Sequence, residues 1–162
     1  MRKLFITIIV GLITKLSFGQ TVDRFTKQVI SETKQINICD NSFSLSNEIM
    51  QMKTSLKRID NKQALRIEIV AKGQLFFREG NSVLFKMKDD SVLDLKFQTT
   101  EYTQRRCFDC AAYDATVFLS VTDADIEVLK NNQIDEIRIY TSEGYVEAKG
   151  NKRRTIEFMK TL

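Results

Sequence analysis

The chain has 162 residues, of which 43% are hydrophobic and 28% charged, with a formal net charge of +4 and three cysteines but no histidine, proline or tryptophan. This length predicts one compact domain, and the mixture of apolar residues with charges of both signs is typical of a folded globular protein. The lack of histidine excludes Ser-His-Asp and Cys-His catalysis, HExxH zinc sites and a histidine pH switch near neutrality.

The first nineteen residues have the pattern of a secretory signal peptide. A basic start and an apolar stretch precede small residues that favour cleavage before Gln20. A membrane-spanning helix needs about 20 apolar residues, and Lys15 interrupts this run too early. We therefore expect residues 1–19 to be removed on export, leaving residues 20–162 as a single domain without a transmembrane helix.

The charge of the mature chain argues against nucleic acid as a partner. Removing the leader takes three of the 25 basic residues and none of the 21 acidic ones, which leaves 22 against 21 and a net charge of +1. A domain that binds nucleic acid through long-range attraction usually carries a large excess of positive charge. We expect no nucleic-acid partner.

Alternation of apolar and polar residues predicts three antiparallel hairpins, because side chains on a strand point to opposite faces in turn. The paired segments are residues 50–57 with 65–70, residues 83–88 with 93–97, and residues 137–139 with 146–148. A further strand is predicted over residues 115–121. Before these elements the pattern is weaker, with a strand expected within residues 25–33 and a loop over residues 41–47.

Two helices are predicted. The first follows Thr122, which fits an N-cap, with Asp125 at the reciprocal position of a capping box. The second runs from Asn151 to the C-terminus with one apolar face. Its inward residues are expected to be Ile156, Phe158, Met159 and Leu162. The elements together predict an α+β fold, with a mainly antiparallel curled sheet or partial barrel built of hairpins, one short inserted helix and one C-terminal amphipathic helix.

Four segments resemble small exported proteins of Bacteroidota-type bacteria. They are residues 17–20, 23–26, 85–95 and 134–145, which include the end of the leader and two of the predicted hairpin regions. The resemblance covers most of the mature chain and implies an exported, periplasmic domain. It supplies no catalytic residue.

The candidate disulfide residues are Cys39, Cys107 and Cys110, and the last two form a CxxC motif. A thioredoxin-like site is excluded because that fold uses a cis-proline and starts a helix at its first cysteine, whereas here a strand follows. Zinc would lack a standard fourth ligand. In an oxidising compartment a structural disulfide is favoured. Bridging Cys39 to either partner constrains the unfolded chain by roughly 4 kcal/mol, against roughly 2 kcal/mol for the short bridge, so the long-range bridge is expected.

Two further groups are candidate binding residues. Basic residues cluster where the last helix begins and would suit an anion, with free backbone amides adding to the attraction. They are Lys149, Lys152, Arg153 and Arg154. Leu75, Phe76 and Phe77 lie in an apolar loop between glycines and would suit contact with a partner, although packing into the core is the alternative.

The sequence as a whole favours a non-enzymatic exported domain that binds an envelope protein or a surface component, with no cofactor and no metal. The alternative is a thiol-disulfide redox or thiol-sensing protein that uses the CxxC at residues 107–110. A small hydrolase using carboxylates alone is the third hypothesis.

Overall fold

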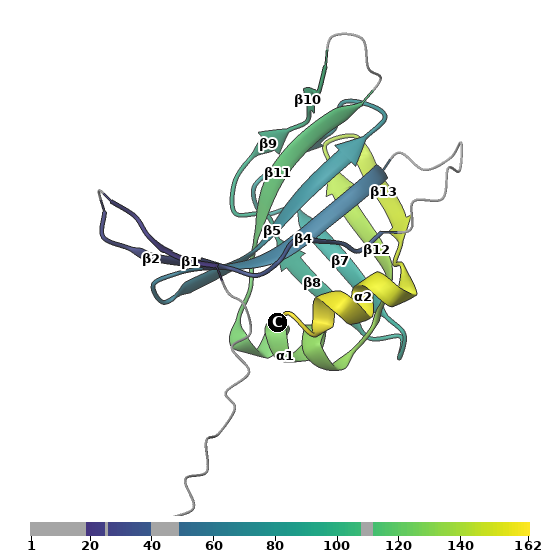
Figure 1. Cartoon of the computed structure of the whole chain (residues 1–162). Helices are drawn as coiled ribbons and strands as arrows, with labels where there is room; N and C mark the ends of the chain where they lie inside the picture. Colours follow the sequence, from purple (N-terminus) through teal and green to yellow (C-terminus); the bar gives the residue numbers. More distant parts are fainter. Residues whose placement is uncertain (1–18, 25, 40–48, 108–111) are drawn as a thin grey trace, which may run out of the picture.

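The computed structural model describes residues 19–24, 26–39, 49–107 and 112–162 (Figure 1). The strands are β1 (Gly19–Val22), β2 (Val29–Glu32), β3 (Ile36–Asn37), β4 (Ile49–Ile59), β5 (Lys62–Ala71), β6 (Phe76–Phe77), β7 (Ser82–Met87), β8 (Val92–Lys96), β9 (Glu101–Tyr102), β10 (Gln104–Arg105), β11 (Tyr113–Ser120), β12 (Ile134–Thr141) and β13 (Gly144–Lys149). The helices are α1 (Asp123–Asn131) and α2 (Lys152–Met159). The α+β class, the antiparallel strands and the two short helices are confirmed.

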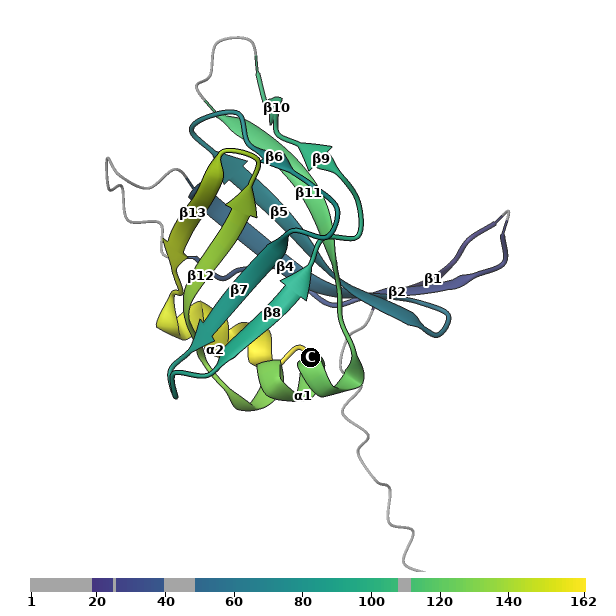
Figure 2. The same ribbon diagram turned by 180° about the vertical axis from the view of Figure 1, so that it is seen from behind.

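The strands form two large sheets that face each other, as Figures 1 and 2 show from opposite sides. One sheet has seven strands in the order β1-β2-β4-β5-β11-β10, with β3 also paired to β4. The other has four strands in the order β13-β12-β7-β8, and β6 and β9 form a small third sheet. All three predicted hairpins are present, as β4–β5, β7–β8 and β12–β13.

The described residues form no closed barrel and no strongly curled sheet. Isolated backbone bridges connect the edges of the two large sheets, between Phe97 and Leu119 on one side and between Cys39 and Gly150 on the other. Phe97, which follows β8, pairs with Leu119 of β11, and the chain then leaves β11 to form β9 and β10. The pairing that would continue one sheet into the other is therefore broken.

The core lies between the two large sheets and consists of the inward side chains of their strands. On β5, Leu65, Ile67 and Ile69 are fully buried, as their alternation predicts. Strand β4 is irregular at its start, where Ile49 is buried and Met50 only half-buried. The register shifts between Ile49 and Gln51, and a bulge of this kind exchanges the faces of the residues before it.

The two helices lie together at one end of the sheets (Figure 1). Helix α1 has the predicted capping box: the Thr122 hydroxyl accepts a hydrogen bond from the Asp125 amide at 3.2 Å, and Asp125 accepts one from the Thr122 amide at 2.8 Å. Helix α2 buries Thr155 and Phe158, whereas Ile156 is 36% exposed. The prediction that Ile156 points inward is wrong, because α2 packs against β3, β12 and α1 through the neighbouring face.

Within the described ranges, no helix is long and apolar enough to cross a membrane. Residues 1–18 of the predicted leader lie outside those ranges, and Gly19, its last residue, pairs with Glu32 in the β1–β2 hairpin.

Candidate functional site

A polar pocket lies on the outer face of the seven-stranded sheet, which points away from the four-stranded sheet. Because alternate side chains on a strand face outward, residues between the core positions form rows across β4, β5 and β11. Two adjacent rows line the pocket: Gln51 with Val70 and Asp114, and Lys53 with Glu68 and Thr116. We call this site the charged pocket.

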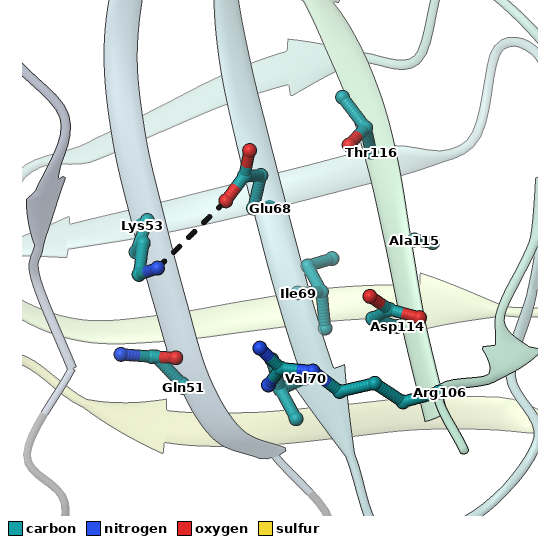
Figure 3. A pocket seen from close by; sticks show the side chains of 9 residues that line it. All are labelled: Gln51, Lys53, Glu68, Ile69, Val70, Arg106, Asp114, Ala115 and Thr116. Atoms are coloured by element: carbon teal, nitrogen blue, oxygen red, sulfur yellow. Dashed lines mark ion pairs between the residues drawn. The ribbon is translucent and has the colours of Figure 1, made fainter. Parts of the chain in front are cut away.

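Arg106 completes the charged pocket from outside the three strands. It follows β10, and its backbone amide donates a hydrogen bond to the Ala112 carbonyl at 2.9 Å. Its side chain extends across β5 toward Gln51 (Figure 3). The pocket volume is about 140 Å³, well below the roughly 300–1,000 Å³ of sites for drug-sized ligands. The charged pocket therefore suits a small polar molecule or a single side chain of a partner.

Glu68 is held in place by three polar neighbours. Its Oε1 accepts hydrogen bonds from Gln35 at 3.0 Å and from Arg66 at 2.5 Å, and Lys53 lies 4.0 Å from its Oε2. The hydrogen bond from Gln35, followed by the charges of Arg66 and Lys53, lowers the pKa of Glu68 below its usual 4.5, against the opposing effect of partial burial. Glu68 is thus ionised at neutral pH and is a poor general acid.

The same network continues along the outer face of the sheet, through Ser55 and Arg66, to Glu32 on β2. Ser55, which is fully buried, donates a hydrogen bond to Glu32 at 2.6 Å, and Arg66 donates a second to the same Glu32 oxygen at 3.2 Å. The side chains of Arg66 and Glu32 are 24% and 30% exposed, so water screens this network less than it screens a surface pair. One side of the charged pocket is therefore rigidly built.

On the other side of the charged pocket, the charged side chains have no ionic partner among the described residues. Within the described part of the chain, the side chains of Arg106, Asp114 and Gln51 make no hydrogen bond or ion pair, although all three line the same pocket. Among the described residues, the side chain of Lys53 has one contact of this kind, at 4.0 Å from Glu68. A cation and an anion with unused hydrogen-bonding capacity therefore face one small volume.

The structure corrects the disulfide prediction for Cys39. Cys39 is a buried thiol, 1% exposed, in the segment that lies beside β4, whereas Cys107 follows β10. Strands β4, β5 and β11 separate the two segments, and four steps of about 4.8 Å place them about 19 Å apart. A disulfide allows at most about 7 Å between Cα atoms. The long-range bridge to Cys107 is therefore wrong, and Cys39 forms none.

The CxxC motif itself is only partly described, because Cys110 lies outside the described residues. The motif stands between β10 and β11, so a strand follows it and not a helix. A helix N-terminus is one of the settings that lower a thiol pKa. Among the described residues, no group of cysteine and carboxylate side chains is arranged to hold a metal ion. Pairing of Cys107 with Cys110 stays a prediction.

The basic cluster is dispersed over the start of α2. Lys152 and Arg153 are exposed, Lys149 lines a pocket with Glu136 and Glu147, and Arg154 lines a different one with Lys34 and Glu157. The Asn151 side chain accepts a hydrogen bond from the Arg154 amide at 3.1 Å, so the helix supplies its own cap. The four basic residues do not converge on one pocket among those described.

The apolar loop residues mostly belong to the core. Phe77 is fully buried, and its ring centroid lies 5.3 Å from that of Phe97. Leu75 and Phe76 are half-buried, and Phe76 pairs with Tyr102 in the small sheet. Because Phe77 is buried, it packs into the core and is not exposed to a partner.

The outer face of the four-stranded sheet also carries charges, of which Arg138 and Glu147 form an ion pair. Arg138 donates hydrogen bonds to Glu147, at 2.8 Å from Nε, and its guanidinium lies 4.4 Å from the Tyr145 ring centroid. The bond to Glu147, followed by one with Tyr140, raises the pKa of Arg138. Glu136 and Lys149 line the same face without an ion pair among the described residues, so unpaired charges also occur outside the charged pocket.

The charged pocket is not evident from the sequence alone. Lys53 and Glu68 are neighbours through the first hairpin, whereas Asp114 joins them from far along the chain through the pairing of β5 with β11. No family model, curated protein or solved structure matches the chain.

Proposed function

We propose that the protein is a non-enzymatic exported binding domain, periplasmic or secreted, and that the charged pocket is its binding site for an envelope or surface component. The observation that carries this proposal is the combination of a fixed ionic network at Glu68 with unused charges on Arg106 and Asp114 beside it. Preorganised charges of this kind bind polar ligands with little loss of side-chain entropy.

The chemistry of the pocket supports binding over catalysis. Glu68 is kept ionised by its neighbours, and Thr116 supplies the hydroxyl in the lining without a hydrogen bond to a base among the described residues. Nucleophilic catalysis needs a base within hydrogen-bond reach of the nucleophile. These residues are therefore suited to recognition.

The leader pattern and the resemblance to exported proteins support the exported location. Expression of the full chain in a bacterium with a cell envelope tests it by intact mass of the envelope fraction. A mass that begins at Gln20 is expected. A full-length protein in that fraction would contradict export with cleavage.

Thermal denaturation of residues 20–162 tests the binding site. The panel should contain carboxylates, amines, amino acids, phosphate and sugars at equal ionic strength, with wild type compared to the double variant Arg106→Ala/Asp114→Asn. We expect at least one class to raise the melting temperature of the wild type alone, because a ligand that binds only the folded state stabilises it. No stabilisation by any class, or equal stabilisation of the double variant, would contradict the proposed site.

A further inference from the structure

We propose that the charged pocket binds the envelope or surface component through a small zwitterionic group, one that carries one ammonium and one carboxylate. This inference rests on the proposed binding function and adds the chemical class of the ligand. The observation behind it is that unused charges of opposite sign, Arg106 and Asp114, line one pocket of about 140 Å³ without pairing with each other.

The cationic side of the pocket suits a carboxylate. The Arg106 guanidinium offers several N–H donors in a fork that matches the two oxygens of a carboxylate. Gln51 adds an amide, and Lys53 adds a second positive charge that its 4.0 Å contact with Glu68 engages only weakly. A carboxylate in this position would receive donors from three side chains.

The anionic side suits an ammonium group, and Asp114 is the residue that would accept it. Glu68 is already occupied by Gln35 and Arg66, so it has less capacity for a ligand. Asp114 lies on β11, one row from Glu68, and its side chain makes no hydrogen bond or ion pair within the described part of the chain. The ligand's positive group would therefore lie toward β11.

Charge and size disfavour the other simple ligands. A dianion would meet the carboxylates of Asp114 and Glu68, and a dication would meet Arg106 and Lys53. Like charges brought together in a partly enclosed site repel each other. A molecule much larger than an amino acid exceeds the volume of the pocket. A single α-amino or ω-amino acid carries one charge of each sign and is small enough for the pocket.

Calorimetric titration of residues 20–162 tests the inference with matched probes. Glycine, β-alanine and 4-aminobutyrate vary the separation of the two charges, while acetate and ethylammonium each carry only one of them. We expect at least one zwitterion to bind about tenfold more tightly than acetate and ethylammonium, because it makes both charge-assisted contacts. Arg106→Ala and Asp114→Asn should each reduce the affinity for that zwitterion by about tenfold.

Two distant substitutions provide the controls. Arg78→Ala and Asp135→Asn remove the same groups from exposed positions outside the pocket and should leave binding unchanged. Melting temperatures of all variants show whether each one folds. If Arg106→Ala does not fold, Gln51→Ala removes a pocket donor without changing the charge and is expected to weaken the zwitterion as well.

The outcomes separate this inference from the proposed function. One outcome is that acetate binds as tightly as every zwitterion, with binding that Arg106→Ala weakens and Asp114→Asn does not change. That result would show an anion site, so the zwitterion inference would be overturned and the proposed binding function would stand. If no probe binds, or binding ignores both pocket substitutions, the zwitterion inference is also overturned. In that case the broader panel of the previous section decides whether the pocket binds anything else.

Discussion

Replacing Thr54 by valine should stabilise the protein. Thr54 lies on the inner side of β4, where its register partners are Ile36 on β3 and Ile67 on β5. The residue is 0% exposed, and its hydroxyl Oγ1 has no hydrogen-bond partner among the described residues. Valine has nearly the same shape and replaces the unsatisfied hydroxyl by a methyl group.

The size of the effect follows from the state of that hydroxyl. A buried polar group without a partner costs about 1–3 kcal/mol, and burial of an added methyl contributes about 0.8 kcal/mol. Part of this gain is lost if the surrounding side chains do not adjust, so we expect an increase of about 1–2 kcal/mol in the free energy of unfolding. In a chain of this length, that increase raises the melting temperature by roughly 2–8 °C.

Thr155→Val is the matched control because it makes the same change at an equally buried position. Thr155 is also 0% exposed, but its hydroxyl donates to the Lys152 carbonyl at 3.1 Å and accepts from Gln133 at 3.3 Å. This substitution should lower stability by about 1–3 kcal/mol. Urea denaturation of both variants measures the two signs. A Thr54→Val protein that is less stable than wild type would refute the reasoning.

Five further substitutions, two of them controls, test the packing and the ionic network. Phe158→Ala should lower the free energy of unfolding in urea by about 3–5 kcal/mol, because the side chain is fully buried. Ile156→Ala, at an exposed position on the same helix, should lower it by less than about 1 kcal/mol. Similar losses for the two variants would contradict the observed face of α2. Glu68→Gln should reduce the free energy of unfolding at about pH 6, and the difference from wild type should disappear as the pH falls below 4.5. The reason is that a carboxyl whose pKa is lowered in the folded state stabilises the fold only while it is ionised. A difference that does not depend on pH would argue against the network. Gly150→Ala places Cβ 2.6 Å from a backbone oxygen and should cost about 1–3 kcal/mol, whereas Gly73→Ala meets no atom within 4 Å and should be near neutral in the same melt. Equal effects of the two glycine substitutions would contradict the close approach at Gly150.

Local sequence signals predicted the local elements well. The β7–β8 hairpin and the Thr122 capping box depend on residues close together in the chain, and both are present. The face of α2 was misassigned because Thr155 and Ile156 are adjacent on a helix of eight residues, and neither polarity nor period shows which of them meets α1 and β3. Short strands such as β6 and β9 have too few residues to show any alternation.

Non-local pairing explains what the sequence did not predict. The division into two sheets depends on where β8 leaves β11, which alternation within each strand does not encode. The charged pocket has the same origin. Its outward residues on β4 and β5 follow from the first hairpin, but Asp114 joins them through the β5–β11 register and Arg106 through the chain leading from β10. The disulfide prediction for Cys39 failed because loop entropy favours long closures without regard to which strands lie between the cysteines.

Amide chemical shifts of isotopically labelled residues 20–162, followed by NMR during titration with the tightest of the three zwitterions, test the central claim most directly. The account predicts that the perturbed amides cluster around the charged pocket on β4, β5 and β11, near Lys53, Val70 and Asp114, and that the cluster disappears in Arg106→Ala. Perturbations centred on β12 and β13, or scattered over both sheets, would contradict the assignment of this face as the binding site.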